Sequence, residues 1–120
     1  MDRTYVVTGA ASGIGAATAS YLRERGSRVI GCDLHDADVI ADLATIEGRA
    51  KLVEGVIRLS GGRIDAIVAN AGGGPAETMV ALNFFGSVAT LEGLRPTLAS
   101  SPAPRAVMVS SVASLGPLEA

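Results

Sequence analysis

Short apolar runs alternate along the chain with longer segments whose apolar residues recur at helical spacing. The short runs are rich in β-branched residues and predict four strands, at Tyr5–Thr8, Arg28–Asp33, Ile64–Ala69 and Ala106–Ser110. Their apolar residues are almost continuous, which is typical of strands that are covered on both faces. The alternation therefore predicts an α/β fold with a parallel sheet and crossover helices.

Three longer segments, 14–25, 47–59 and 79–98, predict helices. Gly26 and the pair Gly61-Gly62 follow the first two and are expected to end them. The predicted apolar stripes are Ile14, Thr18 and Leu22 in the first helix and Val80, Phe84, Val88 and Leu91 in the third. Leu34 to Ala37 are too few for a crossover helix, so the following piece Val39-Ile40-Ala41 is expected to be a shortened or vestigial strand.

Length, charge and cysteine usage narrow the class of protein. The chain has 120 residues, which fits one domain over 1–120, and its net charge of −2 comes without a dense basic run. We therefore expect a soluble protein with no nucleic-acid or membrane partner, in the cytoplasm since MDRTYVV does not resemble a signal peptide. Cys32 is the only cysteine and His35 the only histidine, so neither a disulfide nor a metal site is expected.

The stretch TGAASGIG, Thr8 to Gly15, follows the first predicted strand and opens the first predicted helix. Glycines at such a turn permit tight bending, close approach of backbone N–H groups to a pyrophosphate, and close packing of helix on strand. An anion would lie at the positive N-terminal end of the helix. The motif predicts a Rossmann-type, doubly wound αβα fold and a cofactor site, with a tight turn without ligand as the alternative. Its expected cofactor-binding residues are Gly9, Ser12, Gly13, Ile14 and Gly15.

Asp33 ends the second predicted strand at about the offset where a dinucleotide fold places the carboxylate that accepts the adenosine ribose hydroxyls. The alternative is an aspartate that only forms a turn. A carboxylate at this place would repel the 2′-phosphate of NADP, and Leu34 to Asp38 offer no Arg or Lys to accommodate it. The expected cofactor is therefore NAD rather than NADP.

Several motifs in order resemble the N-terminal half of a short-chain dehydrogenase/reductase. They are TGAASGIG, Asp33, Asp42-Leu43, Asn70-Ala71-Gly72, Asn83 in LNFFG, and VSSVAS. Within the family, HDADVIADLATIEGR, LNFFG and SSVAS are most similar to the bacterial hydroxysteroid dehydrogenase/carbonyl reductase branch. The resemblance implies hydride transfer between a nicotinamide and a carbonyl carbon, with secondary alcohols or ketones, hydroxysteroids among them, as substrates.

The resemblance also implies residue roles. Asp42 would contact the adenine amino group and Leu43 would flank the ring, although Asp42 could instead cap the helix near Thr45. Asn70, Ala71 and Gly72 would line the nicotinamide side of the cofactor. In the catalytic part, Asn83 would hold a water in a proton relay, and Ser111 would bind the substrate oxygen, with Ser110 as the alternative register.

One departure from the family concerns the Tyr-x-x-x-Lys pair, which is expected downstream of the serine. The only tyrosines are Tyr5 and Tyr21, and the only lysine is Lys51, so the sequence is expected to be a fragment that is inactive alone and ends in an unpaired edge strand. The alternative is a non-catalytic NAD-binding module or a degraded remnant of the family. The apolar surface of the helix over 79–98 also suggests a homo-oligomer, with simple packing on the sheet as the alternative.

Overall fold

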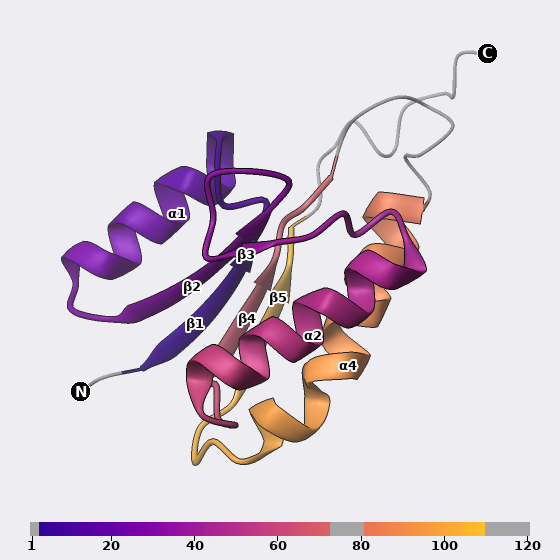
Figure 1. Ribbon diagram of the computed structural model, residues 1–120. Helices are drawn as coiled ribbons and strands as arrows, with labels where there is room; N and C mark the ends of the chain where they lie inside the picture. Colours follow the sequence, from indigo (N-terminus) through magenta and orange to yellow (C-terminus); the bar gives the residue numbers. More distant parts are fainter. Residues whose placement is uncertain (1–2, 73–80, 110–120) are drawn as a thin grey trace.

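Five parallel strands form the centre of the protein in the computed structural model, which describes residues 3–72 and 81–109. The sheet has the order β3-β2-β1-β4-β5. Figure 1 shows how the chain moves outward from β1 to β3 on one side and then continues with β4 and β5 on the other. The strands are β1 Thr4–Thr8, β2 Arg28–Asp33, β3 Val39–Ile40, β4 Ala66–Ala69 and β5 Arg105–Met108.

Helices cover the two faces of this sheet, which confirms the predicted three-layer αβα arrangement (Figure 1). Helix α1 (Gly13–Glu24) packs on one face, where Val7, Ala19 and Val29 form a small core. Helices α2 (Ile46–Ser60) and α4 (Ser87–Ala99) pack on the other face. The larger core lies there, and its fully buried members include Val6, Leu52, Val56, Ile64, Ile67 and Leu94.

Strand β4 begins later than predicted, at Ala66 rather than at Ile64. The amide of Ile64 donates to the carbonyl oxygen of Thr97 in α4 instead of joining the sheet, at 3.2 Å. The next residue, Asp65, is buried, and its carboxylate accepts a hydrogen bond from the Thr4 amide at 2.8 Å. The first two residues of the predicted strand therefore precede β4 and anchor its start to α4 and β1.

The predicted helix over 79–98 is in fact two elements within the described residues. Ala81–Gly86 form a π-helical turn, η1, and α4 follows directly. The predicted apolar stripe is confirmed only at Leu91, which packs against the larger core, and Val80 lies outside the described residues. Phe84 is 57% exposed, and the buried positions of α4 are Ser87, Thr90, Leu94 and Thr97. A π turn holds more residues than an α turn, so every later side chain is rotated relative to the regular spacing on which the prediction relied.

Helix α1 shows a smaller correction, because Ile14 is 65% exposed while Gly15 and Ala19 are buried. Small residues bring α1 close to the sheet, and of the predicted stripe Leu22 packs against the small core. The predicted helix ends are confirmed: Gly26 follows the cap of α1, and Gly61 caps α2 in the left-handed conformation. The predicted short third strand is confirmed as the two-residue β3, which pairs with Cys32 and Asp33 of β2.

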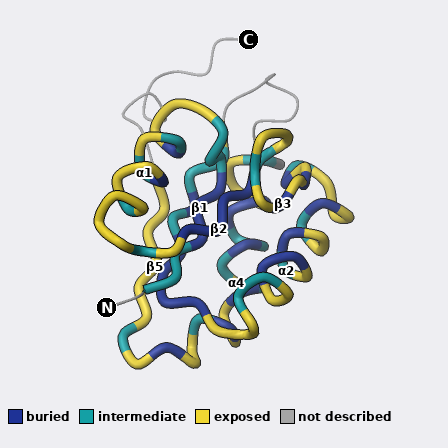
Figure 2. Tube along the Cα trace, turned by 60° about the vertical axis from the view of Figure 1, so that its left-hand side comes forward, coloured by how far each residue is buried: buried dark blue, intermediate teal, exposed yellow. Residues whose placement is uncertain are grey.

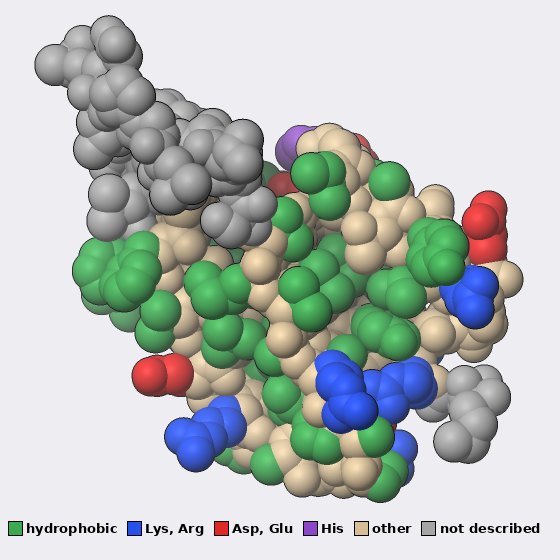
Figure 3. All heavy atoms as spheres, turned by 180° about the vertical axis from the view of Figure 1, so that it is seen from behind, with side chains coloured by type: hydrophobic (Ala, Val, Ile, Leu, Met, Phe, Trp, Pro, Cys, Tyr) green, Lys and Arg blue, Asp and Glu red, His purple; other side chains and the backbone are tan. Residues whose placement is uncertain are grey.

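Strand β5 is an edge strand of the described sheet, as the sequence predicts. The sequence also predicts strands that are covered on both faces, and β5 does not fit this prediction. All four of its residues are exposed, and Val107 is 55% exposed. Figure 2 shows the contrast between β5 and the buried central strands. Figure 3 shows hydrophobic side chains spread over the face seen from behind, with Lys and Arg side chains gathered toward its lower edge.

Candidate cofactor site

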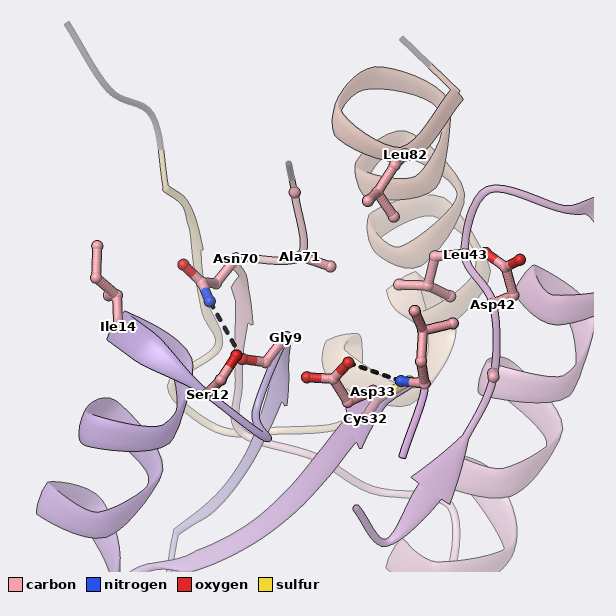
Figure 4. A pocket seen from close by; sticks show the side chains of 13 residues that line it. Gly9, Ser12, Ile14, Cys32, Asp33, Asp42, Leu43, Asn70, Ala71 and Leu82 are labelled. Atoms are coloured by element: carbon pink, nitrogen blue, oxygen red, sulfur yellow. Dashed lines mark hydrogen bonds between the residues drawn. The ribbon is translucent and has the colours of Figure 1, made fainter. Parts of the chain in front are cut away.

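The carboxyl ends of β1, β2 and β4 meet around a cavity of about 310 Å³. It lies at the point where the order of the parallel strands reverses, with β2 on one side of β1 and β4 on the other. Open α/β sheets bind ligands at this point. All the predicted cofactor-binding residues except Gly13 and Gly15 line it. Figure 4 shows most of the lining, which consists of Gly9, Ser12, Ile14, Cys32, Asp33, Leu34, Ala41, Asp42, Leu43, Asn70, Ala71, Gly72 and Leu82.

The glycine-rich turn has the geometry that its spacing predicts. Gly9 and Gly13 have positive φ angles of 68° and 57°. A Cβ atom on Gly15 would lie 1.9 Å from the carbonyl oxygen of Gly9, so only glycine lets the start of α1 fold against the end of β1. The amide of Ala16 donates a hydrogen bond to the carbonyl oxygen of Ser12 at the start of α1. The N–H groups before Ala16 have no partner within a helix, so they can bind an anion.

Asp33 lies at the end of β2 and faces the glycine-rich turn. Its Oδ2 accepts a hydrogen bond from the Ala11 amide at 2.8 Å, and its Oδ1 accepts one from the Leu34 amide at 2.7 Å. The bond from Leu34 is local, as expected of an aspartate that only forms a turn. The bond from Ala11 joins residues 22 positions apart and connects β2 to the glycine-rich turn. The carboxylate is therefore held at the wall of the cavity (Figure 4).

Thr8 is a site residue that the sequence reasoning did not assign a role. Its Oγ1 accepts hydrogen bonds from the amides of Asn70 and Ala71, both at 2.9 Å, and the residue is 1% exposed. One hydroxyl therefore fixes the segment after β4 against the end of β1. The Asn70 side chain adds a longer contact, at 3.5 Å, from its Nδ2 to the Gly9 carbonyl, which Figure 4 marks. The only sequence signal is the position of Thr8 immediately before the first glycine.

Asp42 and Leu43 form the opposite wall. Asp42 Oδ1 accepts a hydrogen bond from the Ala44 amide at 3.0 Å, a local turn. The N-terminal cap of α2 is Thr45, whose hydroxyl accepts a hydrogen bond from the Gly48 amide at 3.0 Å. The alternative interpretation of Asp42 as the helix cap is therefore wrong. Leu43 is buried against the larger core and also lines the cavity.

Of the two predicted catalytic residues, the structure describes Asn83 alone, because Ser110 and Ser111 lie outside the described residues. Asn83 lies in η1 beside the cavity residue Gly72: a Cβ atom on that glycine would be 2.7 Å from Asn83 Oδ1. Its neighbours Phe84 and Phe85 do not bury it, since both rings are exposed and pack edge to face with centroids 5.0 Å apart. The predicted homo-oligomer through this helix stays a prediction.

Cys32 lines the cavity, but its side chain is almost fully buried. Burial, and secondarily the charge of Asp33, raises the pKa of its thiol to about 12, so the group is neutral near neutral pH. Among residues 3–72 and 81–109, no group of three or more His, Cys, Asp or Glu side chains is arranged to hold a metal ion. Over the same residues, no helix has the length and apolar character needed to cross a membrane.

Comparisons with known proteins agree with this geometry. Residues 3–120 match the short chain dehydrogenase family. The 3-alpha-hydroxysteroid dehydrogenase/carbonyl reductase of Comamonas testosteroni is 40% identical over 113 residues, which are 91% of this chain and 44% of that protein. The "Probable oxidoreductase" of Streptomyces lividans is 32% identical over 95% of this chain and 46% of its own length. The chain thus spans less than half the length of these two relatives.

Solved structures resemble the fold closely. The 3-alpha-hydroxysteroid dehydrogenase from Pseudomonas sp. B-0831, crystallised in complex with NADH, superimposes with a TM-score of 0.89 at 41% identity, over 95% of this chain and 46% of that one. The ligand-free aldohexose dehydrogenase of Thermoplasma acidophilum gives 0.81 at 27% identity, over 92% and 50%. These likenesses confirm the Rossmann-type fold and the predicted similarity to the hydroxysteroid dehydrogenase branch.

Proposed function

Because the chain belongs to the short chain dehydrogenase family, we propose that its cavity binds NAD and that the protein is an NAD-dependent oxidoreductase of secondary alcohols and ketones. The observation that supports this most is the position of the Asp33 carboxylate opposite the glycine-rich turn. The turn can bind a pyrophosphate at the N-terminus of α1, and the carboxylate can accept hydrogen bonds from ribose hydroxyls.

The lining of the cavity favours NAD over NADP. Within the described residues, the lining includes two carboxylates, Asp33 and Asp42, and neither Lys nor Arg. A 2′-phosphate would add two negative charges at the Asp33 end of the site, and none of the described lining residues is a cation that could compensate for them. The Pseudomonas relative that was crystallised with NADH supports a nicotinamide cofactor.

Reaction chemistry follows from the family and from Asn83. A bound nicotinamide supplies a hydride acceptor or donor at its C4 atom. On this proposal, Asn83 holds a water for proton transfer, Ser111 binds the substrate oxygen, and Asn70, Ala71 and Gly72 border the nicotinamide ribose. Hydroxysteroids are the proposed substrate class, since two relatives carry that name. A non-catalytic NAD-binding module would share the cavity but would not oxidise a secondary alcohol.

Calorimetric titration of NAD and NADP tests the cofactor assignment. We expect saturable NAD binding that is tighter than NADP binding. Asp33→Asn should weaken NAD binding about tenfold to a hundredfold, because hydrogen bonds to a charged group contribute about 1.5–3 kcal/mol, and should narrow the difference from NADP.

The matched control for this titration is Asp36→Asn. It removes the same charge from an exposed residue three positions away that does not line this cavity, and asparagine tolerates its positive φ of 48°. The control should leave both affinities unchanged. Equal affinity for NAD and NADP, or an unchanged NAD affinity in Asp33→Asn, would contradict the proposal.

A further inference from the structure

The wall of the cavity formed by Asp42 and Leu43 belongs to a short connection between β3 and α2. Residues 41–45 belong to neither a strand nor a helix, yet this wall would have to meet one end of the proposed dinucleotide. The inference below rests on the proposed function, because it concerns how that wall is held. It involves a residue, Arg49, to which neither the motifs nor the family resemblance assigned a role.

Arg49 lies in the first turn of α2 and reaches back to the connection. Its Nε donates to the carbonyl oxygen of Leu43 at 2.9 Å, and its Nη2 lies 3.4 Å from the carbonyl oxygen of Ala44. The shorter of these is the stronger bond. A planar guanidinium suits two acceptors on adjacent residues, because its donors are fixed in a fork. One side chain of α2 thus holds two successive peptide groups of the wall.

Local contacts fix the other end of the same connection. The Thr45 hydroxyl donates to the carbonyl oxygen of Asp42 at 2.9 Å and accepts the Gly48 amide. A Cβ atom on Gly48 would lie 1.8 Å from that Asp42 carbonyl oxygen, so the connection rests directly on the first turn of α2. The carbonyl oxygen of Asp42 is therefore held by Thr45, whereas the carbonyl oxygens of Leu43 and Ala44 are held by Arg49.

We infer that Arg49 is a positioning residue for the adenosine half of the cofactor, acting through the carbonyl oxygens of Leu43 and Ala44. Arg49 does not itself line the described cavity, so its effect on a ligand would pass through the wall. By ordering Leu43 and its neighbour Asp42 before the ligand arrives, it lowers the entropy that binding has to remove.

This role differs from a general contribution to stability. The Leu43 side chain is buried in the larger core, but the hydrogen bonds from Arg49 to the carbonyl oxygens of Leu43 and Ala44 are only partly buried. Water can therefore replace the guanidinium at these oxygens when Arg49 is lost. The fold should then remain intact while the wall becomes less ordered. Ligand affinity is therefore expected to fall with little change in the sheet.

The test is titration of ADP-ribose, which is the adenosine diphosphate half of NAD without the nicotinamide, combined with amide hydrogen exchange. Arg49→Met removes the donors and keeps an apolar stem, and Arg49→Lys keeps the charge without the fork. Lys51→Met is the matched control, since it removes a positive charge from an exposed residue two positions along the same helix.

Arg49→Met should weaken ADP-ribose binding about threefold to tenfold and Arg49→Lys by less, as expected for the loss of one or two hydrogen bonds. The Ala44 amide should exchange faster in Arg49→Met, while the strand amides of Val6 and Ile67 exchange as before and Lys51→Met behaves as the wild type. Unchanged affinity in both Arg49 variants would overturn the inference. Weaker ADP-ribose binding in Arg49→Met that comes with faster exchange of the strand amides would also overturn it. The same holds if Lys51→Met weakens ADP-ribose binding as much as Arg49→Met does. If the wild-type protein does not bind ADP-ribose, the proposed function itself fails.

Discussion

Replacing Thr8 by valine removes one oxygen atom from the centre of the site and almost nothing else. Valine carries a methyl group of similar size in place of the hydroxyl, so the volume of this 1%-exposed side chain is kept while its hydrogen bonding is lost. The change leaves the amides of Asn70 and Ala71 without the acceptor that both use at 2.9 Å. We expect Thr8→Val to destabilise the fold through these two hydrogen bonds.

The size of the effect follows from the burial of the two amides. An unsatisfied buried donor costs about 1–3 kcal/mol, and the half-buried Asn70 and Ala71 place each amide near the lower end of that range. Thr8→Val should therefore lower the free energy of unfolding by about 2 kcal/mol. Thr8→Ser keeps the hydroxyl and loses one methyl group, which costs about 0.8 kcal/mol. The variant that is closer in shape should thus be the less stable one.

Urea denaturation of the two variants measures this difference. With a slope of about 2 kcal/mol per molar urea, Thr8→Val should shift the midpoint by about 1 M and Thr8→Ser by less than half of that. If Thr8→Val is as stable as Thr8→Ser or more stable, then the hydroxyl does not fix the segment after β4, and our account of this edge of the site is wrong.

Two further predictions concern buried titratable groups. Hydrogen bonds from the Ser101 hydroxyl first, and then from the Thr4 amide, hold the pKa of Asp65 below the usual value of an aspartate, 3.8. This carboxylate therefore stabilises the fold fully above about pH 4, and its contribution is lost as the pH falls through the lowered pKa. Urea midpoints measured between about pH 6 and about pH 3 should fall more steeply for the wild type than for Asp65→Asn, and equal slopes would contradict this. Burial raises the pKa of the Cys32 thiol to about 12. Cys32 should therefore not react with a thiol reagent at about pH 8 in the folded protein, and it should react at once in urea. Rapid modification of the folded protein would contradict this prediction.

The parallel αβα fold and the glycine-rich turn could be predicted because their signals are local. The run Tyr5-Val6-Val7 followed by spaced glycines determines a strand, a turn and a helix start within a dozen residues, and Asp33 follows at a fixed offset. The end of α2 at Gly61 is equally local, since glycine adopts the left-handed cap conformation without strain.

Other features depend on contacts that no sequence spacing reveals. Thr8 accepts hydrogen bonds from amides more than 60 residues away, and any residue could supply those amides. Arg49 binds carbonyl oxygens, which every residue carries. The π turn at Ala81–Gly86 changes the helical phase, so an apolar pattern based on regular spacing placed Phe84 on the wrong side of the helix.

The central claim is that a dinucleotide occupies the crevice at the carboxyl ends of β1, β2 and β4. Mapping backbone amide NMR shifts during NAD titration tests it most directly. The account predicts that the largest shifts occur at residues 9–15, 33–34, 42–44 and 70–72, all at that end of the sheet, while Gly61 and Gly62 at the end of α2 stay unchanged. Shifts centred elsewhere, or no shifts in a folded sample at saturating NAD, would contradict it.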